Sequence, residues 1–364
     1  MKVAVLHDYL NQFGGAERVL LVILKIFPEA DIYTLLYDKE KTFGFFEGRK
    51  IYTSILDIGT VKKHHRMFIP LLPLISELFR GREKYDLVIS STAGYAKGFS
   101  VEGKYHISYC HSPLRYAWEI DYLKNLPFSP RVMSRDILYP IARRLKEWDK
   151  KASEKVNLFI ANSRFIAGKI SAYYKRDSEV IYPSVNPVFF REKVKPEEFY
   201  LMVGRLIYYK GFNLGIEAFA KMRKQLVIIG RGPEEQKLKG MADSRYVKFV
   251  SYVSDEKLRG YYSKAKALVF PQIEDFGLVA AEAQACGLPV ISFEKGGGGE
   301  IVIPQETGIL FDTQSVDGIC AAVYEFERKK FDRAKIAKSA ERFSEEIFVK
   351  KFKEAVRNCG FSVL

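Results

Sequence analysis

The feature that most constrains the fold is an alternation of short apolar runs with helical segments, which occurs twice along the chain. Runs of three or four residues rich in Val and Ile suit strands of a parallel sheet that is buried on both faces. Helical periodicity separates many of these runs, and the two series predict two doubly wound α/β domains with parallel sheets. We predict strands at residues 3–6, 87–89, 107–109, 158–160 and 180–182, then at 200–203, 226–229, 247–250, 267–270 and 289–292, and helices at 17–27, 213–222, 255–265 and 278–286.

The chain length and its prolines place the domain boundary. A chain of 364 residues exceeds the usual size of a single core. Pro183, Pro187 and Pro196 cluster between the two series and interrupt regular structure there. We therefore expect a first domain at 1–190, a second at 191–343, and a C-terminal helix within 344–364 that packs back on the first domain.

Composition excludes several classes of protein. With 48% hydrophobic residues the chain is no disordered protein. The four cysteines are far apart and no CxxC or HExxH occurs, so we expect a reducing compartment and no metal site. There is no visible secretory signal and no apolar stretch of about 18 residues, which predicts a cytoplasmic protein. Lys and Arg exceed Asp and Glu by 58 to 44, and residues 1–190 hold 29 of the basic and 20 of the acidic residues, a net +9.

The strongest chemical signal is the stretch EDFGLVAAE at 274–282, which follows a predicted strand and opens a predicted helix. A helix N-terminus offers free N–H groups and a positive dipole end, so it can hold a phosphate or a sugar hydroxyl. Gly277 lets a ligand approach the backbone closely. Glu282 lies about one turn into the helix, where its carboxylate can accept hydrogen bonds from a ribose diol. Glu274 on the preceding loop can accept those of a transferred sugar; two solvated carboxylates beside an ordinary helix are the alternative.

Two cations follow the first strand of the second series, in the stretch GRLIYYKG at 204–211. Arg205 and Lys210 lie beyond the carboxyl end of that strand, where open α/β sheets bind ligands. Together they suit a diphosphate, Arg as a fork and Lys as a point charge. The next strand ends in a second glycine turn at Gly230, which we expect to face the same crevice. The sequence has no DxD triplet, in agreement with a metal-independent site.

These motifs, taken in order, resemble the retaining glycosyltransferases of family 4, which have the GT-B fold of two Rossmann-like domains facing a cleft. The resemblance covers nearly the whole chain and is most like the mannosyltransferase branch. It rests on GGAERVL, YCHSP, IANSRF, VIYPSVN, GRLIYYKG, IIGRGPE and EDFGLVAAE.

The resemblance implies a role for each matching residue. Arg205 and Lys210 would bind the donor diphosphate and take part in catalysis, and Glu274 would bind hydroxyls of the donor sugar near the reacting face. Glu282 would bind the ribose. Further donor contacts would come from Gly230 and from the backbone N–H groups of Phe276, Gly277 and Leu278.

The acceptor side is expected in the first domain. His111, in YCHSP, follows an apolar run and would lie near the acceptor and the anomeric carbon as a catalytic residue. A satisfied structural imidazole is the alternative for this side chain. Gly14 and Gly15 would form the loop after the first strand and face the cleft. This loop lacks the GxGxxG spacing of a nicotinamide site.

The implied activity is transfer of a hexosyl group, mannose from GDP-mannose in first place, without metal or other cofactor. The expected acceptor is a lipid-linked or cell-surface glycan. Residues 61–84 join an apolar core to basic flanks, and 131–151 add seven basic residues against three acidic ones. Such segments can bind an anionic membrane surface, which predicts a peripheral protein on the cytoplasmic face; core packing of residues 67–79 is the alternative.

Other functions stay open at this point. A soluble transferase could use a UDP-sugar on a small sugar or a storage polysaccharide, and a GT-B scaffold could be catalytically idle. A basic nucleic-acid-binding protein is a different class, prompted by the positive charge with 22 Tyr and 27 Phe. We expect no nucleic-acid partner, because most aromatic residues lie within apolar runs and no nucleic-acid motif occurs. The tract 296–299, four consecutive glycines, is interpreted only as low complexity.

Overall fold

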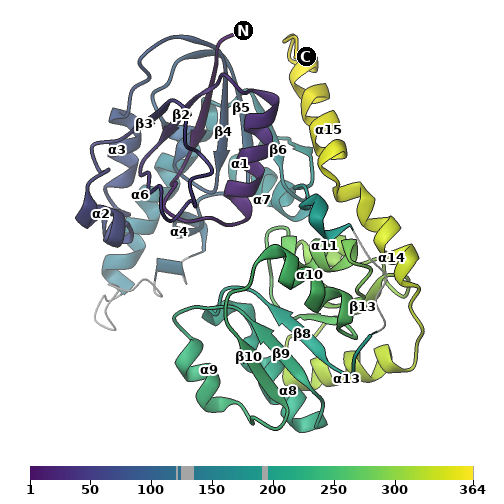
Figure 1. Cartoon of the computed structure of the whole chain (residues 1–364). Helices are drawn as coiled ribbons and strands as arrows, with labels where there is room; N and C mark the ends of the chain where they lie inside the picture. The colour runs from purple at the N-terminus through teal and green to yellow at the C-terminus, as the bar shows by residue number, and fades with distance from the viewer. Residues whose placement is uncertain (120–121, 124–134, 191–195, 364) are drawn as a thin grey trace. The chain divides into compact units, whose positions relative to one another are not determined.

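A computed structural model describes residues 1–119, 122–123, 135–190 and 196–363 (Figure 1). The chain divides into two compact units, Met1–Tyr182 with Val349–Leu364, and Pro183–Phe348. The boundary expected after residue 190 falls beside 191–195, which lie outside the described residues, as do residues 131–134 of the basic segment 131–151. Helix α15 (Glu345–Asn358) begins in the second unit and ends in the first.

The first unit is built on a seven-stranded parallel sheet in the order β3-β2-β1-β4-β5-β6-β7. Its strands are β1 (Val3–His7), β2 (Asp31–Thr34), β3 (Ile51–Thr53), β4 (Tyr85–Thr92), β5 (Gly103–Cys110), β6 (Leu158–Ala161) and β7 (Glu179–Val180). Its helices are α1 (Gly15–Ile26), α2 (Gly59–His64), η1 (His65–Phe68), α3 (Leu72–Leu78), η2 (Ala96–Gly98), α4 (Arg115–Trp118), α6 (Arg135–Glu154) and α7 (Arg164–Tyr174).

The first unit folds around its central strands. Every residue of β1 is buried, as a strand covered on both faces requires. Strands β2 and β3 were not predicted from the sequence, because β2 begins and ends with polar residues and β3 has only three half-buried residues. The C-terminal segment packs in this unit, where the Phe361 and Tyr105 ring centroids lie 6.0 Å apart.

The second unit has a six-stranded parallel sheet in the order β10-β9-β8-β11-β12-β13. Its strands are β8 (Tyr200–Val203), β9 (Leu226–Ile229), β10 (Val247–Val250), β11 (Leu268–Phe270), β12 (Val290–Phe293) and β13 (Gly308–Phe311). Its helices are η3 (Pro187–Phe189), η4 (Tyr208–Lys210), α8 (Phe212–Met222), α9 (Glu235–Met241), α10 (Asp255–Lys264), α11 (Leu278–Ala285), α12 (Gly298–Ile301), α13 (Val316–Glu327), α14 (Arg333–Ala340) and η5 (Glu341–Phe343).

The predicted α/β class with two Rossmann-like parallel-sheet domains is therefore confirmed. In each sheet the strand order reverses once, between β1 and β4 in the first unit and between β8 and β11 in the second. At such a switch point the loops leave in opposite directions and open a crevice at the carboxyl ends of the strands. Most of the candidate site residues lie on the loops that leave the sheets near these two switch points.

Candidate active site

The switch point of the second unit brings together one predicted cation and one predicted carboxylate. Lys210 ends η4, which follows β8, and Glu274 lies on the loop after β11. The Lys210 Nζ lies 2.8 Å from Glu274 Oε1, with the two side chains 13% and 19% exposed. The Gln272 amide also donates to Glu274, at 3.4 Å. The pair is shielded enough for its charges to interact strongly and accessible enough to meet a ligand.

Two glycines, Gly204 and Gly230, form the backbone turns next to the Lys210–Glu274 pair. A Cβ on Gly204 would lie 3.2 Å from Lys210 Nζ, so the bare backbone leaves room for the ammonium group. Gly230, after β9, has a φ of +154°, and a Cβ there would overlap the carbonyl oxygen of Gly204. The glycine turns after β8 and β9 thus pack backbone against backbone, which explains why both positions need glycine.

Helix α11 opens beside Glu274. Its N-cap is Gly277, with a φ of +95°, where a Cβ would lie 3.0 Å from the Phe270 ring. Phe276 is buried and Leu278 is half-buried. The Ala280 N–H already donates to the Gly277 carbonyl, at 2.9 Å. The N–H groups of Leu278 and Val279 precede the first bond of the helix, so they can meet an anion or a hydroxyl oxygen at the same strand ends.

Glu282 is turned inward. Its side chain is buried, and the Tyr262 hydroxyl donates to Glu282 Oε2 at 3.3 Å. Burial, and then the Glu282 charge, raise the pKa of Tyr262, so this hydroxyl stays protonated and remains a donor. Arg205 is exposed. Among the residues the structure describes, no hydrogen bond or ion pair joins Arg205 to Lys210 or Glu274.

The glycine tract after β12 is a structural part of the site that sequence reasoning missed. The Gly297 N–H donates to the Glu274 carbonyl at 2.8 Å. A Cβ at Gly296 would lie 2.7 Å from that carbonyl, and one at Gly297 would overlap the backbone of Phe276. The tract therefore supports the loop that carries Glu274. Its position a few residues after a predicted strand was the signal that could have found it.

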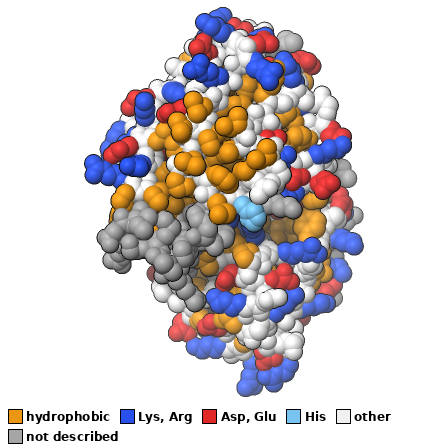
Figure 2. Space-filling model, turned by 90° about the vertical axis from the view of Figure 1, so that its left-hand side faces the viewer, with side chains coloured by type: hydrophobic (Ala, Val, Ile, Leu, Met, Phe, Trp, Pro, Cys, Tyr) orange, Lys and Arg blue, Asp and Glu red, His pale blue; other side chains and the backbone are white. Residues whose placement is uncertain are grey.

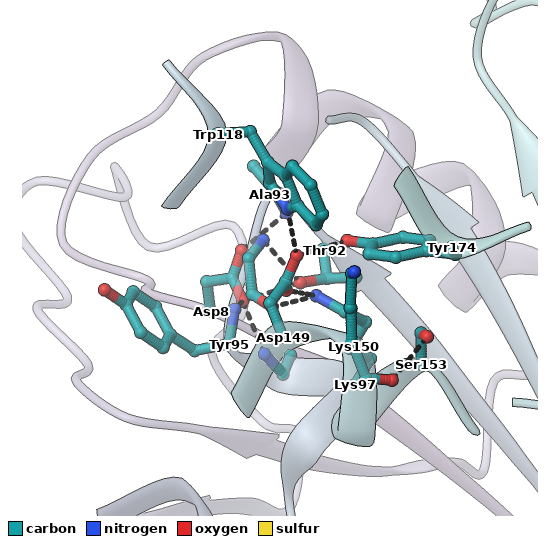
Figure 3. A network of polar contacts seen from close by, with 12 residues as sticks. Asp8, Thr92, Ala93, Tyr95, Lys97, Trp118, Asp149, Lys150, Ser153 and Tyr174 are labelled. Carbon is teal, nitrogen blue, oxygen red and sulfur yellow. Dashed lines mark hydrogen bonds and ion pairs between the residues drawn. The ribbon is translucent and has the colours of Figure 1, made fainter. Parts of the chain in front are cut away.

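In the first unit a buried carboxylate closes the switch point between β1 and β4 (Figure 3). Asp8 follows β1 and accepts hydrogen bonds from the last residue of β4 and from the loop after it. The Thr92 hydroxyl donates at 2.8 Å, and the N–H groups of Ala93, Tyr95 and Ala96 donate at 2.6, 2.8 and 2.6 Å. Four bonds to one carboxylate fix this loop relative to β1.

His111 follows β5 directly, as predicted, and is half-buried. The His111 side-chain Nε2 lies 2.9 Å from the Ser91 hydroxyl, and the His111 backbone N–H donates to the Thr92 carbonyl at 2.8 Å. The Asn162 amide donates to the His111 carbonyl at 3.0 Å. The imidazole is thus oriented by β4, next to the loop that Asp8 holds, and this position at the carboxyl edge of the sheet suits a site residue as well as a structural one.

The loop that carries Gly14 and Gly15 is shaped by a second buried carboxylate. Glu17 accepts the Gly14 N–H at 2.8 Å and lies 3.7 Å from His7 Nε2. Burial alone would raise the pKa of Glu17, but the hydrogen bond and charge of His7, with the Gly14 N–H, lower it. An ionised Glu17 therefore caps α1 and fixes the glycine loop.

A buried ion pair supports the loop that Asp8 holds (Figure 3). Lys97 Nζ lies 2.5 Å from Asp149 Oδ1, and the two side chains are 1% and 0% exposed. Lys97 also donates to the Gly94 carbonyl at 2.5 Å. Asp149 accepts from Trp118 Nε1 at 2.8 Å and from the Tyr174 hydroxyl at 2.7 Å. This cluster joins α4, α6 and α7 to the loop after β4.

Comparison with known proteins identifies the class. Residues 13–189 match the family described as Glycosyltransferase Family 4, and residues 187–343 match the one described as Glycosyl transferases group 1. The Anabaena protein HepE in complex with UDP shares the fold, with a TM-score of 0.68 and 18% identity, over 98% of this chain and 100% of that chain. These are GT-B glycosyltransferase domains, and the chain belongs to glycosyltransferase family 4.

Curated relatives match over shorter segments. The glycogen synthase of Mycobacterium tuberculosis is 36% identical over 143 residues, which cover 36% of this chain and 34% of the relative. The GDP-mannose-dependent α-(1-6)-phosphatidylinositol monomannoside mannosyltransferase of Mycolicibacterium smegmatis is 31% identical over 138 residues, covering 33% of this chain and 36% of the relative. The matches with these two relatives thus span about a third of each relative's length.

Proposed function

We propose that the protein is a retaining glycosyltransferase that moves a hexosyl group from a nucleotide-sugar donor to an acceptor hydroxyl. The observation that carries this proposal is the Lys210–Glu274 pair, which lies at the switch point of the second unit. A diphosphate needs the cation and a sugar needs the carboxylate. Their juxtaposition suits one ligand that carries both groups.

The residues of this chain suggest an electrostatic mechanism. As the bond between the anomeric carbon and the diphosphate oxygen breaks, the leaving group gains negative charge. Lys210, Arg205 and the first N–H groups of α11 would stabilise that charge, so the proposed step needs no metal ion. The acceptor hydroxyl would attack the same face of the sugar, and an oxygen of the leaving phosphate would take its proton. Glu274 would hold the sugar hydroxyls.

The first unit would supply the acceptor side. His111 is held at the carboxyl edge of its sheet by Ser91 and Asn162, and the loop with Gly14 and Gly15 lies after β1 at the same edge. We assign His111 the position nearest the anomeric carbon. Glu282 is assigned to the ribose, although its burial means that Tyr262 would share the carboxylate with the ligand.

Mannose from GDP-mannose is the donor we propose first, because one relative is a GDP-mannose-dependent mannosyltransferase. The acceptor would be a lipid-linked or cell-surface glycan, used at the cytoplasmic face of a membrane. Among the described residues no helix is both long and apolar enough to cross a bilayer. A UDP-sugar with a storage polysaccharide as acceptor is the second candidate, favoured by the likeness to a glycogen synthase.

The donor can be identified by thermal shift with GDP, UDP, ADP and their sugars, since a ligand that binds the native state raises its melting temperature. The decisive variant is Lys210→Ala, which should abolish most turnover of the donor so identified and leave the fold intact. Its matched control is Lys221→Ala, which breaks an exposed pair with Asp317 of similar length, 2.7 Å, in the same unit. Near-normal turnover of Lys210→Ala, or no shift with any nucleotide, would reject the proposal.

A further inference from the structure

The first unit exposes eight large apolar side chains from three neighbouring segments, here called the apolar face. Each of these side chains belongs to a residue that is 52% to 80% exposed. Figure 2 shows a broad apolar region on the face of the molecule that carries α2 and α3, with charged side chains of both signs around it. Apolar clusters of this kind mark contact surfaces rather than ordinary protein surface. The members of the apolar face are Phe43, Phe45, Ile55, Ile58, Met67, Leu71, Leu74 and Leu78.

Helix α3 explains how one short segment serves both the core and this face. Leu72 and Ile75 are 0% and 8% exposed and pack into the core of the first unit. Leu71, Leu74 and Leu78, three and four positions apart, lie together on the opposite side and are 52%, 56% and 59% exposed. Core packing, one of the two alternatives for residues 67–79, therefore accounts for one side of the segment and leaves the other side exposed.

The apolar face adjoins the glycine loop of the candidate active site. Phe13, directly before Gly14, stacks on Phe45 with ring centroids 4.6 Å apart and meets Phe43 edge-on at 6.1 Å. Asn11 Nδ2 lies 3.1 Å from His65 Nδ1, which joins the start of the same loop to η1. A ligand held on the apolar face therefore has a short path to the loop at the end of β1.

The charge around the apolar face is positive. Residues 38–84 contain ten Lys and Arg against six Asp and Glu, a difference of 10 − 6 = +4. Lys39, Lys41 and Lys62 are paired with carboxylates. Within the described part of the chain, Arg66 and Arg80 have no carboxylate within ion-pair distance. Arg80 is exposed and Arg66 is half-buried, and both belong to the same stretch of the chain as the exposed leucines.

We propose that the apolar face docks on a bilayer with anionic headgroups, with Leu71, Leu74 and Leu78 in the acyl boundary and the two arginines at the phosphates. Apolar side chains rimmed by cations are what such an interface binds. Docking would place the glycine loop where a lipid-linked acceptor could reach it while its lipid stays in the membrane. This consequence rests on the proposed function. A protein surface would not by itself require the unpaired cations around the leucines.

The test is flotation of the full chain with vesicles of phosphatidylcholine alone or with 30% phosphatidylglycerol, at low salt. We expect binding to the anionic vesicles and a loss of at least about tenfold in the partition coefficient for Leu71→Ser/Leu74→Ser/Leu78→Ser. The matched control is Met241→Ser/Tyr324→Ser, which removes exposed apolar side chains of the second unit and should bind as the unaltered protein does.

A second variant guards against misfolding of the first. Arg66→Gln/Arg80→Gln keeps the leucines and should lower binding to the anionic vesicles about tenfold, with little change on neutral ones. Absence of binding by the unaltered protein, or binding unchanged in both variants, would overturn the proposal. So would a dimer that the leucine variant dissociates, because a second copy would then cover this face. The thermal shift with donor should persist in every variant. Absence of this shift in the unaltered protein would count against the proposed function and not against membrane docking.

Discussion

The buried Lys97–Asp149 pair allows a double-mutant cycle whose outcome the structure fixes in sign. Lys97→Met removes the cation and leaves a carboxylate that is 0% exposed, with Trp118 and Tyr174 as its remaining donors among the described residues. Asp149→Asn leaves the buried ammonium group with the Gly94 carbonyl and at most one amide oxygen. Each single change therefore leaves an uncompensated buried charge.

Removing one partner of a buried pair costs about 3–5 kcal/mol of unfolding free energy. For a unit of this size that lowers the melting temperature by roughly 6–20 °C. The double variant leaves no charge of this pair buried. Its loss of unfolding free energy should therefore be smaller than the sum of the two single losses, by about 2 kcal/mol or more. The control is Lys104→Met, whose pair with Asp86 is 76% and 33% exposed and should contribute at most about 1 kcal/mol.

Tryptophan fluorescence during urea unfolding is a suitable assay. Both tryptophans of the chain, Trp118 and Trp148, lie in the first unit. Trp118 donates to Asp149, and the Trp148 ring lies 5.7 Å from that of Tyr95. The signal therefore reports the unfolding of the cluster itself. The reasoning would be refuted if the losses of unfolding free energy in the two single variants added up in the double variant. It would also be refuted if each single variant were as stable as the Lys104→Met control.

Two further predictions concern a glycine and two histidines. Gly230→Ala forces a methyl group onto the Gly204 carbonyl, so we expect a loss of about 2–3 kcal/mol and weaker nucleotide binding by calorimetry; Gly240→Ala, with no atom within 4 Å, should be neutral or stabilising. Burial, as the main cause, lowers the pKa of His65 and His106 to about 4 each. Because the unfolded chain binds these protons near pH 6.5, the first unit should lose stability as pH falls from about 6.5 towards 4; urea midpoints that stay constant over this range would contradict this.

The sequence was sufficient for most of the fold because buried parallel strands are short apolar runs that stand out against their flanks. It failed where a strand lacks that contrast. Strand β13 opens with Gly308, whose missing side chain makes room for the Val290 carbonyl, so it resembles a turn in the sequence. Strand β2 owes its place to pairing with β1 and β3 rather than to its own composition.

The candidate site divides in the same way. The proximity of Lys210 and Glu274 follows from strand order alone, since both leave the carboxyl ends of strands at one switch point. The role of Asp8 depends on the conformation of a loop about 85 residues away along the chain, between Thr92 and Ala96, and no local pattern encodes it. The burial of Glu282 against Tyr262 likewise depends on helix packing that spacing does not determine.

The backbone-to-backbone packing of Gly204, Gly230 and Gly297 has a practical meaning for engineering. A combinatorial library aimed at new sugar preferences should keep these positions constant, because any substitution there deforms neighbouring loops before it meets a substrate. Diversity belongs at solvent-facing neighbours such as Ile273 and Tyr208, which are 41% and 44% exposed. Altered selectivity could then evolve on an unchanged frame.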